Sequence, residues 1–186
     1  MKAETQQRGA AGIPLRFSGF LPLAALISVA IAGTSAVSPL DAETEAELRS
    51  LFPEAASFAV KAGQLPHFRV YQGEEPALVG FAYYTTDIEK LERGYKAPIN
   101  FLVGMTVAGE IIGVRLIEHD EPYGYFSIET DEFSAQFKGK SILDRFRVGR
   151  DIDAISSATI TIASAARGIR NSGRRIARQF LAEGGS

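Results

Sequence analysis

Hydrophobic positions along this chain follow three patterns, and each pattern predicts a different kind of element. An uncharged run from Phe17 to Leu40 has its apolar centre at Leu21–Ala32 and is long enough to span a bilayer. Between Phe68 and Glu118, short segments rich in aromatic and β-branched residues predict strands. Over 158–181, apolar residues recur at three- and four-residue spacing and predict a long helix. The pattern predicts a membrane-directed leader followed by one α+β domain, in which a long C-terminal helix packs on a small antiparallel sheet.

Two strand-like segments stand next to each other at 100–107 and 110–118, and Ala108-Gly109 between them predicts a hairpin. Gly113 in the second arm indicates a bulge or a close approach of another backbone. The other predicted strands are 68–72, 78–86 and 146–148, and the other predicted helices are 41–51, 53–63 and 131–137.

The N-terminal run follows Lys2, Arg8 and Arg16, which is typical of a secretory signal peptide or of a single membrane anchor. Small residues near 33–42 offer a cleavage site, so both interpretations stay open, with a buried core helix as the third. The domains are therefore predicted as a leader or anchor over 1–40 and a folded domain over 41–186. Either export route places that domain outside the cytoplasm, anchored to the inner membrane or released into the periplasm.

Composition narrows the chemistry. The 186 residues include no cysteine, which excludes c-type haem attachment, thiolate-bound iron–sulfur clusters and disulfides. The two histidines, His67 and His119, cannot alone form a typical zinc site, so no metal is expected. A net charge of −2 gives no reason to expect nucleic acid. Any redox chemistry requires an organic cofactor.

The segment Asp153-Ala-Ile-Ser-Ser-Ala-Thr-Ile-Thr161 places serines and threonines where a loop leads into the last predicted helix. The first amides of a helix lack internal partners and carry a partial positive charge, which suits a phosphate group. Ordinary N-capping of the helix is the alternative.

These nine residues resemble the D-x-x-[ST]-G-A-T-x-T signature of FMN-binding domains that carry flavin as a covalent threonine ester. Further features of this family follow in the same order along the chain: Leu78–Ala82, Gly94-Tyr95, Pro98-Ile99, Leu102–Met105, Gly113-Val114 and His119–Pro122. The chain is most similar to the periplasmic domain of the membrane flavoprotein needed for nitrous oxide reductase activity. More distantly, it resembles the flavin subunits of the sodium-pumping NADH:quinone reductase and of the Rnf complex.

The resemblance implies that a flavin transferase uses FAD to place FMN phosphate on Thr159. Amides of Ser157, Ala158 and Thr159 would then bind the phosphoester, assisted by the hydroxyls of Ser156 and Thr161. Asp153 would set the turn or be recognised by the transferase. The family glycine is replaced by Ser157, which is harmless at an ordinary φ but strains the turn, or blocks the transferase, if φ is positive.

In this family the loop that corresponds to 119–125 lies against the isoalloxazine ring. Tyr123 or Tyr125 would stack on the ring, and His119 or Glu121 would hydrogen-bond to its polar edge, with Pro122 fixing the backbone. A solvated turn is the alternative. The arginines at 167, 170, 174 and 178 form a basic stripe, interpreted as a solvated helix face or as a docking surface for an acidic partner or lipid headgroups.

The expected function is electron transfer through covalent FMN, in support of a membrane redox protein or respiratory complex, rather than catalysis on a substrate of its own. One alternative is a flavin-free interaction or assembly module that lost attachment because of Ser157. Noncovalent FMN in the same pocket is a further alternative.

Overall fold

The computed structural model describes residues 40–184, and these residues form an α+β domain, as the sequence predicts. Five strands make one antiparallel sheet in which each strand pairs with its neighbour in the sequence. The elements are α1 (Ala42–Leu51), β1 (Ser57–Lys61), β2 (His67–Gln72), β3 (Ala77–Tyr84), α2 (Thr85–Ile88), β4 (Asn100–Thr106), β5 (Ile111–Glu118), η1 (Gly124–Phe126), α3 (Asp131–Ala135) and α4 (Thr159–Gly184).

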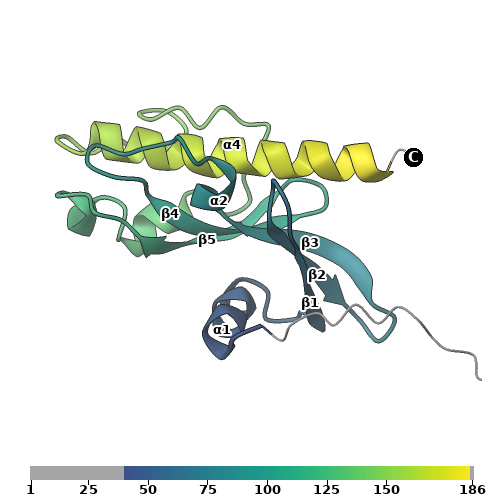
Figure 1. Cartoon of the computed structure of the whole chain (residues 1–186). Helices are drawn as coiled ribbons and strands as arrows, with labels where there is room; N and C mark the ends of the chain where they lie inside the picture. Colours follow the sequence, from purple (N-terminus) through teal and green to yellow (C-terminus); the bar gives the residue numbers. More distant parts are fainter. Residues whose placement is uncertain (1–39, 185–186) are drawn as a thin grey trace, which may run out of the picture. The chain divides into compact units, whose positions relative to one another are not determined.

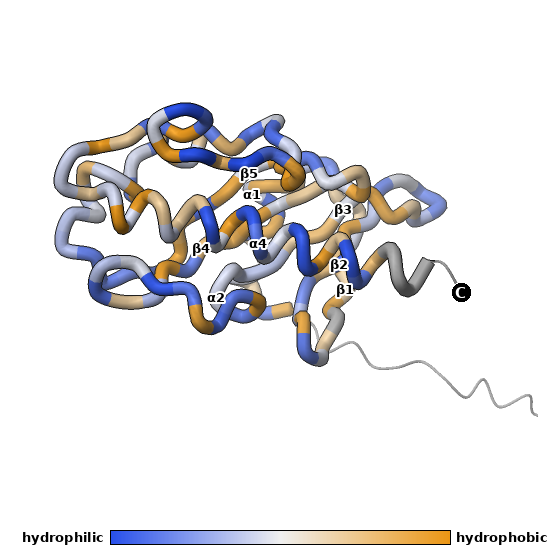
Figure 2. The backbone as a smooth tube through the Cα atoms, turned by 90° about the horizontal axis from the view of Figure 1, so that it is seen from above, coloured by the Kyte–Doolittle hydropathy of each residue, from blue (hydrophilic) through white to orange (hydrophobic). Residues whose placement is uncertain are grey.

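The sheet separates two hydrophobic clusters. The long helix α4 covers one face, where its Ile162 and Ile169 pack with Phe81, Phe101 and other side chains of the strands. The short helix α1 covers the other face, on which Leu48 and Phe52 meet Val70, Ala82 and Leu102. Figure 1 shows the two helices on opposite sides of the strands. In Figure 2 hydrophobic colour follows much of the strands, and hydrophilic colour is prominent in the connecting loops.

The predicted hairpin is confirmed as β4 and β5, which pair from Asn100↔Glu118 to Met105↔Ile111. Gly109 in its turn has a φ of +83°, a conformation that glycine adopts without steric cost. The register shifts between the pairs Gly104↔Gly113 and Met105↔Ile111, so the predicted bulge forms beside Gly113, and a Cβ on Gly113 would lie 3.1 Å from the Leu51 side chain.

Two sequence-based predictions are wrong. No helix forms over 53–63, because Ser57–Lys61 adds β1 to the edge of the sheet, with Phe58 opposite Val70. No strand forms over 146–148 either. Phe146 has a φ of +49°, and Val148 makes a single bridge to Ile152.

The leader predicted over 1–40 lies, apart from Leu40, outside the described residues and stays a prediction. Within residues 40–184, no helix combines the length and the hydrophobicity needed to cross a bilayer.

Three arginines of the predicted basic stripe hold neighbouring loops rather than facing solvent freely. Arg167 binds Glu92 at 2.7 Å, and Arg170 donates to the carbonyl oxygen of Arg145 at 2.6 Å. Arg174 donates to three successive carbonyl oxygens, those of residues 142, 143 and 144. Helix α4 therefore fixes the loops beside it as well as the core below it.

Two glycines of α4 give a matched test of this packing. A Cβ on Gly173 would lie 2.7 Å from both Ile142 and the Tyr83 hydroxyl, whereas a Cβ on Gly168 would meet only Glu92 at 3.8 Å. We expect Gly168→Ala to stabilise the domain by about 0.5–1 kcal/mol, because alanine favours helix. We expect Gly173→Ala to destabilise it by about 1–2 kcal/mol, because overpacking outweighs the helix propensity. Chemical denaturation of both variants measures these changes, and equal effects would contradict the packing.

Candidate functional site

A buried carboxylate joins three segments at the N-terminal end of α4. The Glu121 side chain, which follows β5, accepts hydrogen bonds from the amides of Tyr95 at 2.8 Å, Lys96 at 2.8 Å and Ala97 at 3.1 Å. It also accepts a hydrogen bond from the Thr161 hydroxyl in the first turn of α4, at 2.5 Å. Glu121 is only 6% exposed, so these four donors replace its hydration.

The same contacts determine its ionisation. Burial alone would raise the pKa of Glu121, but the hydrogen bonds from Thr161 and from the amides of Lys96, Ala97 and Tyr95 outweigh burial. The net effect is a pKa below the ordinary value of 4.5, so the carboxylate is ionised at neutral pH.

Two glycines make room for these contacts. A Cβ on Gly94 would lie 2.6 Å from the Glu121 carboxylate, and a Cβ on Gly124 would lie 2.2 Å from the His119 ring. His119 accepts a hydrogen bond at Nδ1 from the Glu121 amide and makes a 3.0 Å contact with Glu129 through Nε2. His119 and Glu121 are therefore tied to each other and to the protein.

The chain enters α4 through a tight turn. The Ala158 amide donates to the Ile155 carbonyl oxygen at 3.1 Å, which closes a β-turn. Ser157 is its third residue and has a φ of +72°, so the turn is of type II and serine adopts a conformation that favours glycine. Because Ala158 uses its amide in this turn, that amide is not open to a ligand, contrary to the expectation from the sequence.

Beyond this turn, the first turn of α4 is open. The amides of Thr159, Ile160 and Thr161 have no hydrogen-bond partner within residues 40–184, as is usual for the first residues of a helix. The Thr159 residue is exposed, whereas Thr161 is 2% exposed and directs its hydroxyl to Glu121. The two threonines of the motif thus differ in what can reach them.

A cavity of about 300 Å³ opens beside this turn. It is lined by residues of three segments: Tyr95, Tyr123, Ser157, Thr159, Ile160 and Thr161. Both tyrosines are largely accessible, at 67% and 45% exposure. Glu121 binds the segment that carries Tyr95 and the helix that carries Thr159, so it fixes two of the walls.

The remaining predicted residues do not line the cavity. Asp153 donates its amide to the Gln136 side chain at 2.6 Å, and its own side chain is exposed. Ser156, Pro122 and Tyr125 are exposed as well, and the Tyr125 ring packs edge-on against Phe126.

Tyr95 and Ile160 line the cavity but were not among the predicted site residues. Tyr95 could have been found, because Gly94-Tyr95 is one of the features shared with FMN-binding domains. Ile160 carries a weaker signal, namely an apolar residue between the two threonines of the motif that is 57% exposed.

Comparison with known proteins agrees with this geometry. Residues 94–172 match the family model for the FMN-binding domain, and the match includes the turn at 94–97, Glu121 and the start of α4. This part of the chain is therefore similar to FMN-binding domains.

Two relatives are both named as a subunit of an ion-translocating oxidoreductase complex. The protein of Vibrio atlanticus (strain LGP32) is 31% identical over 87 residues, which cover 41% of this chain and 42% of the relative. The protein of Shewanella loihica (strain ATCC BAA-1088 / PV-4) is 30% identical over 107 residues, which cover 52% of this chain and 48% of the relative. The chain spans about half the length of these relatives or less. The similarity is consistent with the predicted relationship to the Rnf flavin subunit, and special closeness to the nitrous oxide flavoprotein stays a prediction.

The residues at the cavity fit the phosphate and ring of FMN, the cofactor of this family. The open amides of the first helical turn suit an anionic phosphate, and the two accessible tyrosine rings suit a flat aromatic system. Glu121 is an anion nearby, but its charge is compensated by four donors and faces away from solvent.

Replacing Glu121 tests whether its hydrogen bonds hold the site together. In Glu121→Gln an NH₂ group faces protein donors, and the charge that strengthened the bonds is gone, so we expect a loss of roughly 2 kcal/mol of unfolding free energy. The pKa of Glu121 is lower in the folded than in the unfolded state. The stability that its ionised form contributes is therefore complete above the unfolded-state pKa and is lost as pH falls through the folded-state pKa. The wild type should therefore lose stability on acidification through this range, and the variant should lose less.

Glu75→Gln, at an exposed carboxylate in the β2–β3 connection, is the matched control and should leave stability nearly unchanged. Urea unfolding at neutral pH and at successively lower pH values measures both effects. Equal stabilities of the two variants at neutral pH would disprove the structural role of Glu121.

Proposed function

We propose that this chain is an electron-transfer protein that carries FMN as a phosphoester on Thr159. The observation that carries the proposal is that the exposed residue Thr159 lies at an open helix start and lines a cavity in the part of the chain that matches the FMN-binding domain. FMN supplies the redox chemistry, since no side chain of this cysteine-free protein takes that role.

The difference between the two threonines supports Thr159 as the attachment site. A transferase must reach the hydroxyl, and Thr159 is exposed whereas Thr161 is buried and donates a hydrogen bond to Glu121. Attachment forms the ester bond at Thr159 Oγ1 and breaks the pyrophosphate bond of FAD, with AMP leaving.

The protein residues then bind and orient the group. The amides of Thr159, Ile160 and Thr161 point out of the helix start and stabilise the negative phosphate. Tyr95 and Tyr123 provide faces for the ring, and Ile160 contributes an apolar wall that displaces water. The Asp153 amide donates to the Gln136 side chain and so holds the segment that leads into the turn.

The relatives give the proposal its setting. Both are named as subunits of an ion-translocating oxidoreductase complex, so we place this domain in a membrane redox complex, with a flavin transferase as its maturation partner. The apolar run predicted as a signal peptide or anchor would carry the domain to the periplasmic side.

Replacement of the attachment hydroxyl tests the proposal directly. When the full chain is co-expressed with a flavin transferase, Thr159→Ala should lack covalent flavin, whereas Thr159→Ser should retain it because the hydroxyl remains. Intact mass and flavin fluorescence of the denatured protein report the bond. Ser156→Ala is the control, since its exposed hydroxyl does not line the cavity, and it should load like the wild type. Undiminished fluorescence of denatured Thr159→Ala would exclude Thr159.

A second candidate, the flavin-free interaction module, rests on one observation: Ser157 has the positive φ of a glycine position, and it lines the cavity. Ser157→Gly removes the strain and the side chain together. We expect it to raise the free energy of unfolding by about 0.5–1 kcal/mol, after the greater unfolded-state entropy of glycine is subtracted. Under our proposal, Ser157→Gly carries as much covalent flavin as the wild type. A flavin adduct on Ser157→Gly and none on the wild type would favour the flavin-free module instead.

A further inference from the structure

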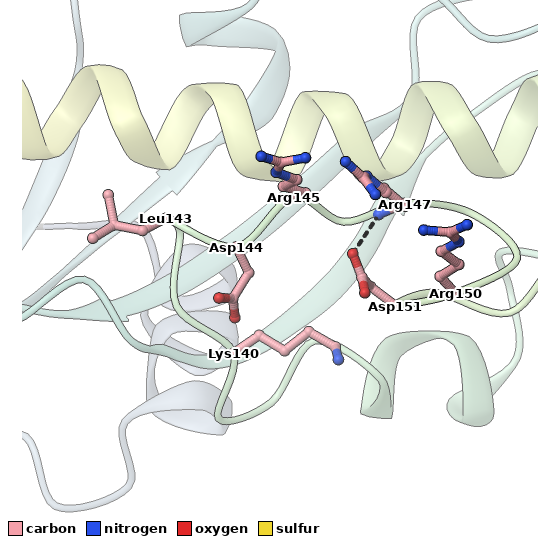
Figure 3. Close-up of a pocket in the computed structure, with 7 residues that line it drawn as sticks. All are labelled: Lys140, Leu143, Asp144, Arg145, Arg147, Arg150 and Asp151. Atoms are coloured by element: carbon pink, nitrogen blue, oxygen red, sulfur yellow. Dashed lines mark hydrogen bonds between the residues drawn. The ribbon is translucent and has the colours of Figure 1, made fainter.

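A second cavity, of about 480 Å³, lies in the loop between α3 and α4. It is lined by four cations, two carboxylates and one leucine: Lys140, Arg145, Arg147, Arg150, Asp144, Asp151 and Leu143. Figure 3 shows that these side chains come from one loop that runs alongside α4. No feature of the FMN site uses them.

The four cations lack counter-charges. Within residues 40–184, no carboxylate oxygen lies within 4.0 Å of a side-chain nitrogen of these four residues. The two carboxylates of the cavity serve the backbone, since Asp144 accepts from the Ser141 amide at 3.0 Å and Asp151 from the Arg147 amide at 2.9 Å. Four positive and two negative charges leave the cavity with a net charge of +2, although the whole chain is at −2.

The loop that carries these cations is fixed. Arg170 and Arg174 of α4 bind the carbonyl oxygens of residues 142–145. Phe146 is 5% exposed and packs edge-on against Phe137, although its φ of +49° is strained for a bulky residue. Its neighbours Arg145 and Arg147 are both exposed. The backbone is therefore held in a costly conformation that displays arginines on both sides of a buried anchor.

We propose that this cavity binds a phosphate group. Arginine presents a planar set of donors that matches phosphate oxygens, and a rigid backbone reduces the entropy lost on binding. A multiply charged anion fits better than a single carboxylate, because several uncompensated cations face one volume. The source is either a soluble phosphate compound or the headgroups of an anionic bilayer, and the exposed Leu143 at the cavity suits the second. The proposal does not depend on flavin attachment.

The test uses Arg147→Gln/Arg150→Gln. Neither side chain makes a hydrogen bond to another residue within 40–184, and the bonds that shape the loop involve the main chain of these residues. The fold should therefore survive. The control Arg115→Gln/Arg178→Gln removes the same charge from two exposed positions outside the cavity. Equal thermal unfolding of the three proteins checks that loss of binding is not loss of folding.

In the first arm, inorganic pyrophosphate is titrated into the full chain in neutral detergent, with ionic strength held constant by chloride. We expect saturable shifts of the amide resonances of residues 140–151 in the wild type and the control. Affinity should fall about tenfold or more in Arg147→Gln/Arg150→Gln, since two charge-assisted contacts are removed.

In the second arm, the same proteins bind vesicles of phosphatidylcholine with and without phosphatidylglycerol. The N-terminal segment is common to all of them, so a loss confined to Arg147→Gln/Arg150→Gln on the anionic vesicles identifies bilayer headgroups as the source. Pyrophosphate binding with equal vesicle binding identifies a soluble phosphate compound. If both arms give the same result for this variant and the control, the cavity does not recognise phosphate and the proposal is overturned.

Discussion

The arrangement of the site depends on one buried carboxylate. Glu121 is removed from water, which by itself opposes ionisation, and it remains charged because three amides and one hydroxyl converge on it. These donors come from the 94–97 turn and from α4, segments 24 to 40 residues away in the sequence. The bonds therefore both satisfy the charge and hold the walls of the cavity at a fixed separation. An apolar residue at 121 would leave those three amides without a partner, so the charge has a structural reason that does not involve flavin.

Helix α4 connects this site to the rest of the domain. Its apolar side completes the core above the sheet, its first turn opens into the FMN site, and its arginines bind the loops beside it. Those arginines satisfy carbonyl oxygens that a short loop cannot pair within itself. The arginines of α4 lie close enough to affect one another: burial and the neighbouring charges of Arg174 and Arg167 lower the pKa of the Arg170 guanidinium. One helix thus contributes both to the FMN site and to the fixed backbone of the cationic loop.

Local patterns predicted the parts of the fold that depend on local physics. The β4–β5 hairpin and α4 follow from alternation, turn residues and helical spacing, and the structure confirms them. Residues 53–63 misled because Pro53-Glu54 is typical of a helix start, whereas Ser57–Lys61 pairs with β2 and tertiary pairing outweighs local preference. The positive φ of Phe146 has no signal in the sequence, because it depends on the burial of the ring and on the bonds that α4 makes to the preceding residues.

The candidate site was predictable to a similar degree. The motif predicted part of the cavity correctly, because the lining residues Ser157, Thr159 and Thr161 fall within five consecutive positions of the sequence. The direction in which the Glu121 side chain points was not predictable, because it is set by amides that are distant in the sequence. The sequence offered the carboxylate only as a possible contact to the ring, and nothing short of three-dimensional packing shows it bound to the 94–97 turn.

The conformation of Ser157 bears on whether a transferase could reach the proposed attachment site at Thr159. Its φ of +72° reproduces the backbone conformation expected of the family glycine, so the turn that presents Thr159 is formed with serine in place. A strain of about 1 kcal/mol changes a conformational equilibrium about fivefold, and the turn is also held by its own hydrogen bond and by the burial of Ala158. Strain of that size does not remove the attachment geometry. If serine prevents loading, the cause must be its side chain, which lines the cavity that the proposed transferase would enter to reach Thr159.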